Sequence, residues 1–347
     1  TAIALTVTEN TSNGIGADAF AIVSVGGRKI GLSSSGKSPE ALSFETFSEA
    51  GKVPRFGFKP ITVPGAVKLW KTLHDRFGRL PFKTLFAPAI DLAHQGFMVA
   101  PTVKKGMQRA RDIYQKVLTD DIHQPFLNTF FNQDLDGRYT LKDHAKTLAM
   151  IAEDPDGFYA GELMQTMVDF FQSNGGYLTA NDFQAHEAIW QTPLSIQAFG
   201  GTLYELPPNG QGIVALKALD IYQRTTSSLH REIESLKRAF VSGKKVMHGM
   251  MQDAEIQQYL DPTHSQKEAD MIRETAEDFI DPFNEDHGTV YLATADPEIQ
   301  VSLIQSNYMG YGAGIVVPGT GIALQNRGAN FLLKKHPNQY APGKKPY

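Results

Sequence analysis

The chain has 347 residues, of which 41% are hydrophobic and 20% are charged, and its formal net charge is −4. This composition is ordinary for a globular protein, and the small negative charge gives no reason to expect nucleic acid or an acidic membrane surface as a partner. The chain contains no cysteine, which excludes disulfides, thiolate catalysis and cysteine-ligated metals.

The first 60 residues are predicted to be rich in β-structure. Residues 2–8 alternate loosely between apolar and polar side chains, and residues 19–25 form an apolar run typical of a buried strand. Gly26-Gly27 then predicts a hairpin turn, after which residues 29–32 are expected to pair with the strand at residues 19–25.

Helical spacing dominates the middle of the chain. Helices are predicted over residues 64–77, 85–94, 103–118, 141–151 and 161–171, with Asp182 as a helix cap further on. Strands are then predicted at residues 191–197 and 202–206, and helices at 213–222 and 229–241.

A second hairpin is predicted near the end of the sequence. Residues 289–295 are rich in β-branched and aromatic side chains, residues 299–305 alternate, and Asp296-Pro297-Glu298 supplies the turn between them. Strands at both ends of the chain with helices between them fit an α+β protein in which helices cover stacked sheets.

The stretch from Gly31 to Ser38 (GLSSSGKS) matches the phosphate-loop pattern G-x-x-x-x-G-K-S. In a P-loop nucleotidase, Lys37 would contact the phosphates and Ser38 the magnesium ion. The sequence context argues against this rival class, because Pro39 follows at once and residues 40–51 lack the apolar stripe of the required helix.

Gly288-Thr289 opens the first strand of the second hairpin. A threonine hydroxyl is a weak nucleophile, but the threonine's own α-amine can act as its base once the chain is cut before it. The ordinary pKa of that amine is about 7.7–8.0, so part of it is unprotonated at neutral pH. Glycine before the threonine tolerates the strained backbone that such a cut requires. By spacing alone, Thr289 is better explained as a β-branched residue that begins a strand.

Several long segments resemble the γ-glutamyltranspeptidase family. They are TENTSNGIGADAF, VPGAVKLWKTLHDRFGRLP, FAPAIDLAHQGF, ELPPNGQGIVALKALDI, GTVYLATAD and SLIQSNYMGYGAGIVVPGTGIALQNRGANF. The resemblance implies an N-terminal-nucleophile hydrolase with a stacked αββα fold that cuts itself between Gly288 and Thr289. Thr289 would be the nucleophile, residues 1–288 the large-subunit part and residues 289–347 the start of the small subunit. The two parts would form one αββα domain, and the chain is expected to be incomplete at both ends.

The same resemblance places the residues that support the nucleophile. A hydroxyl on the second strand corresponds to Ser306, and the asparagine of the motif corresponds to Asn307 unless Tyr308 takes its place. Ser306 and Asn307 are equally explained as loop-forming residues, and the alternation of IQVSLIQS can be read in either phase.

Two departures from the family pattern bear on the substrate. Family members that bind a free glutamyl group use an arginine for the α-carboxylate and an aspartate for the α-amine, and here Ser35 and Ala329 stand at those places. Losing both charged partners would weaken binding unless other groups replace them. The candidate substrate-binding residues are Ser35, Tyr308, Asn326, Arg327 and Asn330, with Lys37 as a further substitute.

We therefore expect a self-processing N-terminal-threonine amidohydrolase or acyltransferase that cleaves γ-glutamyl amides such as glutathione through an acyl-enzyme. Because Ser35 and Ala329 replace the family's charged residues, three alternative functions remain open. They are a cephalosporin or glutaryl acylase, an oxamate-type amidohydrolase, and a family member that binds its ligand without catalysis. The ten histidines show no metal-ligand spacing, so neither a metal nor a cofactor is expected.

The expected partners are a small amide substrate and, for each cleaved fragment, the other fragment. A homodimer is also compatible with the sequence. Apolar runs fall short of the roughly 18 residues of a membrane span, and no signal peptide is evident. A cytoplasmic location is favoured, or a periplasmic or secreted one if a signal peptide precedes residue 1.

Overall fold

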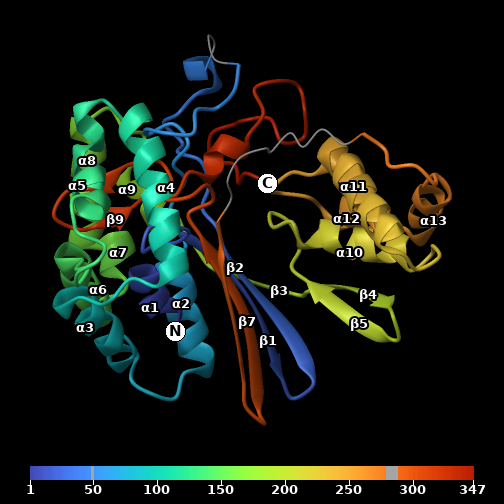
Figure 1. The fold of residues 1–347 in the computed structure, drawn as a ribbon, viewed down its shortest axis with the longest axis horizontal. Coiled ribbons are helices and arrows are strands. Elements are labelled where there is room, and N and C mark those ends of the chain that lie inside the picture. The colour runs from blue at the N-terminus through green and yellow to red at the C-terminus, as the bar shows by residue number, and fades with distance from the viewer. Residues whose placement is uncertain (48–50, 279–287) are drawn as a thin grey trace.

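The computed structural model describes residues 1–47, 51–278 and 288–347, and its central element is a five-stranded sheet of order β3-β2-β1-β7-β6 (Figure 1). The strands are β1 (Asp18–Val25), β2 (Arg28–Ser34), β3 (Ile189–Gln191), β6 (Val290–Ala295) and β7 (Ile299–Ser306), and all neighbours are antiparallel. Because β7 lies between β1 and β6, the two ends of the chain share one sheet.

Both predicted hairpins are confirmed. Gly26 and Gly27 have φ angles of +54° and +79°, which suits the tight turn between β1 and β2. In the turn between β6 and β7, the Asp296 carboxylate accepts backbone N–H groups of Glu298 at 2.8 Å and Ile299 at 2.7 Å. This Asx turn sets the register of the second hairpin.

One face of the sheet is covered by helices α1 to α9 (Figure 1). Five of the seven predicted helices lie here and are confirmed as α2 (Ala66–Phe77), α3 (Ala87–Gln95), α4 (Pro101–Val117), α6 (Lys142–Glu153) and α8 (Glu162–Ser173). The others are α1 (Ala2–Thr8), α5 (Gln124–Phe131), α7 (Gly157–Ala160) and α9 (Ala180–Gln184). They enclose the largest hydrophobic core, to which Leu303 of β7 also contributes.

On the other face lie a β-hairpin and a second group of helices (Figure 1). The hairpin is β4 (Leu194–Ala198) with β5 (Gly201–Glu205), and the helices are α10 (Gly212–Tyr222), α11 (Leu229–Val246), α12 (Asp253–Tyr259) and α13 (Pro262–Asp270). These helices have their own core around Ile213 and Ile221. The layers run helix, sheet, sheet, helix, which confirms the predicted α+β class and αββα arrangement.

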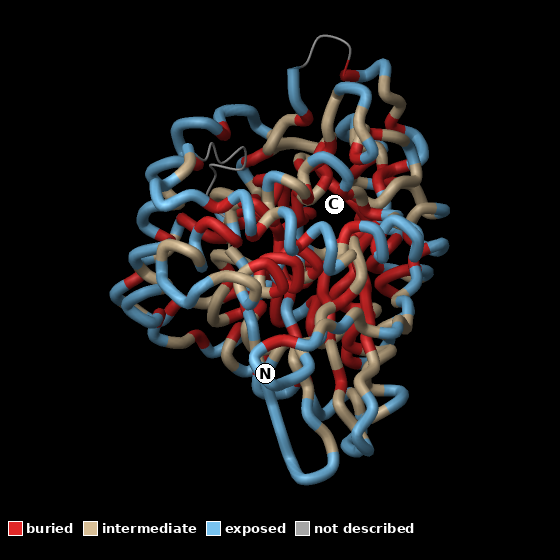
Figure 2. The backbone as a smooth tube through the Cα atoms, turned by 90° about the vertical axis from the view of Figure 1, so that its right-hand side faces the viewer, coloured by how far each residue is buried: buried red, intermediate tan, exposed pale blue. Residues whose placement is uncertain are grey.

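Short elements complete the described chain. They are the strands β8 (Val316–Val317) and β9 (Ile322–Ala323) and the 3-10 turns Phe44–Phe47, Phe82–Leu85, Asp121–His123 and Arg327–Asn330. Figure 2 shows the buried backbone gathered in the interior, with the C-terminal end among it. In the described ranges, no helix is long and apolar enough to cross a membrane.

Three local predictions are wrong. Residues 2–8 form a helix, because the buried side chains Ile3, Thr6 and Val7 follow helical rather than strand spacing. The strand predicted at residues 191–197 is interrupted by Thr192-Pro193, since proline cannot donate to a ladder. The cap of α9 is Thr179, and Asp182 closes the capping box at the third helical position.

The remote phosphate-loop alternative, against which the sequence context argues, is excluded by the structure. Gly31 to Ser34 belong to β2, where they pair with neighbouring strands instead of forming a loop. A Cβ atom added to Gly36 would lie 1.8 Å from the carbonyl oxygen of Val63, so this glycine serves close backbone packing. No helix begins within residues 37–43, all of which the structure describes.

Candidate functional site

Thr289 lies directly before β6 and beside Ser306, the last residue of β7. The register that pairs Val290 with Gln305 brings Thr289 next to Ser306. Thr289 Oγ1 donates to Ser306 Oγ at 3.2 Å, and Ser306 Oγ donates to the carbonyl oxygen of Gly288 at 2.9 Å. One hydroxyl therefore contacts both the predicted nucleophile and the carbonyl of the predicted cleavage bond.

Gly288 fits tightly against the N-terminal part of the chain. A Cβ atom built on it would lie 2.5 Å from Ser12 Oγ. A larger residue before Thr289 would therefore displace either Ser12 or the bond that precedes Thr289.

Tyr308 adopts an unusual backbone conformation next to Ser306. Its φ angle is +76°, a region that aromatic residues rarely occupy. The backbone N–H of Tyr308 donates to Ser306 Oγ at 2.9 Å, and the Tyr308 ring centroid lies 5.3 Å from Arg327 Cζ. Strain of this kind is concentrated at functional sites because the surrounding structure must enforce it.

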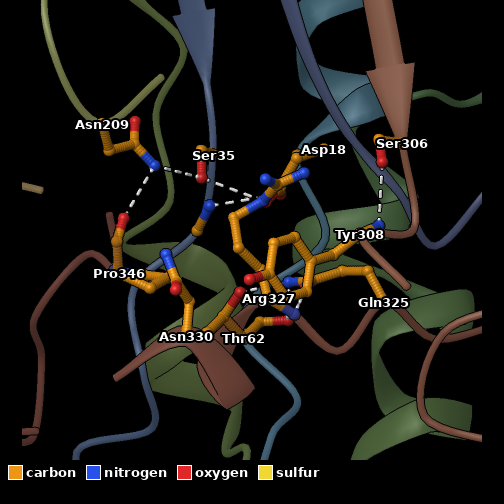
Figure 3. Close-up of polar contacts among 12 residues, drawn as sticks. Asp18, Ser35, Thr62, Asn209, Ser306, Tyr308, Gln325, Arg327, Asn330 and Pro346 are labelled. Carbon is orange, nitrogen blue, oxygen red and sulfur yellow. Dashed lines mark hydrogen bonds and ion pairs between the residues drawn. The ribbon is translucent and has the colours of Figure 1, made fainter. Parts of the chain in front are cut away.

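A buried ion pair lies beside these residues. Arg327 Nε donates to Asp18 Oδ2 at 2.8 Å, and Asp18 is fully buried at the start of β1. Figure 3 shows Asp18, Arg327 and Tyr308 at the centre, with Ser35 and Asn209 on one side and Ser306 on the other. Burial raises the pKa of the Asp18 carboxyl, and the Arg327 charge opposes this effect.

The Asp18 carboxylate also receives donors from the loop after β2. Ser35 Oγ donates to Asp18 Oδ2 at 3.0 Å, and the backbone N–H of Gly36 donates to Oδ1 at 3.3 Å. Asn209 Nδ2 in turn donates to Ser35 Oγ at 2.8 Å. The carboxylate is therefore held by three separate donors.

A cavity of about 570 Å³ brings part of this arrangement together. Thr289, Ser306, Tyr308 and Arg327 line it, and α11 contributes Lys237 and apolar side chains. Its size is within the range of small-molecule sites. Four of the predicted site residues thus share one cavity.

The other predicted residues lie outside the lining. Asn307 is fully buried, and neither polar atom of its side chain has a hydrogen-bond partner among the described residues. Asn326 is also buried, and its Nδ2 atom donates to the carbonyl oxygens of Arg55 at 3.0 Å and Gly312 at 3.1 Å. Asn330 Nδ2 donates to the backbone oxygen of Tyr347, and the Ser35 hydroxyl donates to the Asp18 carboxylate.

Sequence reasoning missed Asp18, Asn209 and Lys237. Asp18 could have been noticed as an acidic residue placed directly before a strongly apolar strand, a position where a carboxylate is buried only with partners. Asn209 and Lys237 carry no such signal, because only the fold brings them to the cavity. Within the described part of the chain, no three histidine, aspartate or glutamate side chains cluster to hold a metal.

Comparison with known proteins shows which proteins this chain resembles. The chain is similar to the glutathione hydrolase-like YwrD proenzyme of Bacillus subtilis, with 30% identity over 333 residues, 90% of this chain and 62% of the relative. It is 32% identical over 367 residues to the oxamate amidohydrolase proenzyme of Klebsiella pneumoniae, which covers 100% of this chain and 69% of the relative. The chain thus spans 62–69% of the length of these two relatives.

The chain is also similar to a protein of known structure. The crystal structure of cephalosporin acylase from Bacillus halodurans superimposes with a TM-score of 0.92 at 41% identity, over 100% of this chain and 67% of that one. The family model described as gamma-glutamyltranspeptidase matches residues 1–347. The resemblance noticed in the sequence is confirmed, and the chain belongs to the gamma-glutamyltranspeptidase family.

Proposed function

We propose that the protein is a self-processing amidohydrolase whose nucleophile is the hydroxyl of Thr289, released as an N-terminal residue by cleavage after Gly288. The observation that carries this proposal is the position of Ser306, whose hydroxyl contacts both Thr289 Oγ1 and the Gly288 carbonyl oxygen. The names of the relatives, which are proenzymes, support the same reading.

Self-cleavage follows from this arrangement. Thr289 Oγ attacks the carbonyl carbon of Gly288, the peptide C–N bond breaks, and the nitrogen of Thr289 takes up a proton. The resulting ester between Gly288 and Thr289 is hydrolysed by water, which leaves a carboxylate on Gly288 and a free amine on Thr289. The Ser306 hydroxyl, which donates to the Gly288 oxygen at 2.9 Å, stabilises the negative charge that develops there.

Substrate turnover uses the same hydroxyl with a new base. The free α-amine of Thr289 accepts the proton from Oγ, which attacks the amide carbonyl of the substrate and expels the amine. Water or another amine then attacks the acyl-enzyme ester and restores Thr289. Ser306 supports Thr289 in both reactions, and Tyr308 and Arg327 contact the acyl group in the cavity.

Two acyl donors are in competition. γ-Glutamyl amides such as glutathione are the first candidate, supported by the name of the Bacillus subtilis relative. Acyl groups without an α-amine, as in cephalosporin-type or oxamate-type substrates, are the second. One observation favours the second candidate: no aspartate or glutamate occurs among the described residues that line the cavity.

Intact mass and N-terminal sequencing of the purified full-length protein test the proposal. We expect two fragments, the smaller beginning Thr-Val-Tyr, in wild type and in the matched control Thr289→Ser, which keeps a hydroxyl. Thr289→Ala should remain one chain. A wild-type protein that is never cleaved would overturn the proposal. A homodimer of the cleaved protein is a separate proposal, to be tested by sedimentation equilibrium.

A further inference from the structure

We infer that Asp18 is a positioning residue, which holds Arg327 so that its free edge binds a carboxylate on the acyl group of the substrate. The cavity would then select acyl donors that carry a carboxylate without a neighbouring ammonium group. This inference rests on the proposed function and adds to it the chemistry by which the acyl group is recognised.

Only a carboxylate fits the environment of Asp18. Its Oδ2 atom accepts from Arg327 Nε and Ser35 Oγ, and its Oδ1 atom accepts from the backbone N–H of Gly36. All three neighbours are donors, so both side-chain oxygens must be acceptors. An asparagine at this position would point its NH₂ group at a donor, and either Arg327 or the loop after β2 would move.

Arg327 is oriented so that part of its guanidinium remains available. Its Nε atom is bonded to Asp18, whereas its two terminal nitrogens have no hydrogen-bond partner among the described residues. The side chain is 13% exposed and lies on the cavity wall. Two terminal nitrogens in one plane form the fork that binds a carboxylate through two parallel hydrogen bonds.

Aromatic rings restrict the guanidinium further. Arg327 Cζ lies 5.3 Å from the centroid of the Tyr308 ring and 5.8 Å from that of Phe20. Rings at this distance attract a cation and limit the rotamers that the side chain can adopt. Asp18 and the two rings therefore fix the direction in which the fork points.

The sheet places this fork next to the nucleophile. Asp18 and Ser306 are direct partners in the antiparallel pairing of β1 with β7, and directly opposed residues present their side chains on the same face. Ser306 is bonded to Thr289 Oγ1. A carboxylate bound by Arg327 therefore belongs to the acyl group attached to Thr289.

The charges around the cavity favour an anion over a zwitterion. Two cationic side chains, Arg327 and Lys237, line it, and no acidic side chain does so among the described residues. Lys237 Nζ is already bonded to Glu234 Oε1 at 2.7 Å and to the carbonyl oxygen of Glu277 at 2.7 Å. An ammonium group on the acyl chain would lose its hydration on entering the cavity and would find no carboxylate among the described lining residues. Desolvation of such an unpaired charge is unfavourable.

The test compares three p-nitroanilides of the same chain length in the full-length protein: glutaryl, pentanoyl and γ-glutamyl. Pentanoyl lacks the terminal carboxylate. γ-Glutamyl keeps that carboxylate at the same position and adds an ammonium group on the neighbouring carbon. We expect the highest kcat/KM for glutaryl. Arg327→Met should lower the glutaryl-to-pentanoyl ratio of kcat/KM by about 10- to 100-fold, the value of one or two charge-assisted hydrogen bonds.

Asp18→Asn separates positioning from direct contact. It should lower the same ratio, mainly by raising KM for the glutaryl compound, and Asp18→Asn with Arg327→Met should lower it no further than Arg327→Met alone. Asp220→Asn is the matched control, because Asp220 is a buried acid paired with Arg224 at 3.0 Å outside the cavity. It should leave the ratio unchanged.

Arg327→Lys provides a second variant should Asp18→Asn fail to fold. It keeps the charge but not the fork, and we expect a ratio between those of wild type and Arg327→Met. Equal losses on glutaryl and pentanoyl substrates in the Arg327 variants, or additive losses in the double variant, would overturn the inference. A cleaved wild type that prefers γ-glutamyl or pentanoyl would also overturn it and leave the proposed function standing. An uncleaved, inactive wild type would instead remove the proposed function.

Discussion

Asp18 and Ser306 face each other across the pairing of β1 with β7. Asp18 holds Arg327 by a buried ion pair, and Ser306 is bonded to both Thr289 and Gly288. The chemistry that we propose for Thr289 and the recognition that we propose for Arg327 therefore depend on one antiparallel register. A shift of that register by one residue would turn one of the two side chains to the opposite face.

Ser306→Ala should slow self-cleavage by about 100-fold, the effect of losing one hydrogen-bond donor to a developing oxyanion. The measurement is the rate at which the fragment beginning at Thr289 appears in freshly purified precursor. Ser302→Ala is the matched control, because Ser302 is on the same strand and its hydroxyl donates to that of the exposed Tyr291 at 3.3 Å. Cleavage of Ser306→Ala at the wild-type rate would contradict the role given to Ser306.

After cleavage, the two fragments should stay associated. Strand β7 pairs with β1 over eight residue positions, and Leu303 and Tyr311 are buried in the same core as Trp70. Separation would expose this apolar surface to water. We expect one peak in gel filtration under native conditions, with two bands on a denaturing gel. Separate elution without denaturant would show that the shared sheet does not hold the fragments together.

Gly36→Ala should destabilise the protein by about 3 kcal/mol, because the added methyl group overlaps backbone that cannot yield easily. The ideal Cβ position is 1.8 Å from the carbonyl oxygen of Val63. Urea unfolding measures the change. Gly51→Ala is the control, since no described residue would lie within 4 Å of a Cβ atom built there. Stabilisation of the wild type by added phosphate would contradict the packing role that we give this glycine.

The stability of the protein should fall as the pH drops from about 6.5 to 4. Burial lowers the pKa of His144 from 6.5 to about 4, so the unfolded chain binds a proton in this range before the folded protein does. The contribution of neutral His144 is complete above pH 6.5 and is lost as the pH falls towards 4. A shift of this size corresponds to about 3 kcal/mol.

Urea unfolding at several pH values measures this slope. His144 Nε2 lies within hydrogen-bond distance of Thr6 Oγ1, at 3.2 Å. In His144→Gln, which keeps a hydrogen-bonding group here but does not titrate, the slope should be smaller. His94→Gln is the control, because His94 is exposed and its replacement should leave the slope unchanged. An unchanged slope in His144→Gln would contradict the assignment.

Much of the fold could be predicted because the signals were local. The hairpin between β1 and β2 follows from an apolar run and Gly26-Gly27, and α2 follows from helical spacing that stops at Gly78. The error at α1 has a physical cause, since a seven-residue segment is too short for its period to be read. The interruption between β3 and β4 follows from Pro193, which has no backbone N–H to donate to a neighbouring strand.

The candidate site could be predicted only in part. The family resemblance predicts Thr289 and Ser306, and the structure brings their hydroxyl oxygens to 3.2 Å. Asn326 and Asn330 instead donate to backbone oxygens and are not among the residues that line the cavity. The phase of β7 could not be read from its alternation. Pairing with β1 turns Ser306 towards the cavity, while Gln305 accepts a hydrogen bond from Trp70 Nε1 at 3.1 Å.

The sequence by itself determined the family, most of the order of helices and strands, and the residue at which cleavage is proposed, because these depend on patterns between neighbours along the chain. Only the tertiary structure decided that Asp18, Ser35 and Arg327 form one network beside Thr289. These residues come from β1, the loop after β2 and a turn more than 300 positions from Asp18, as the separation of 309 residues between Asp18 and Arg327 shows. Their contact arises from strand pairing and the burial of charge, and no local pattern in the sequence shows which residues will be paired.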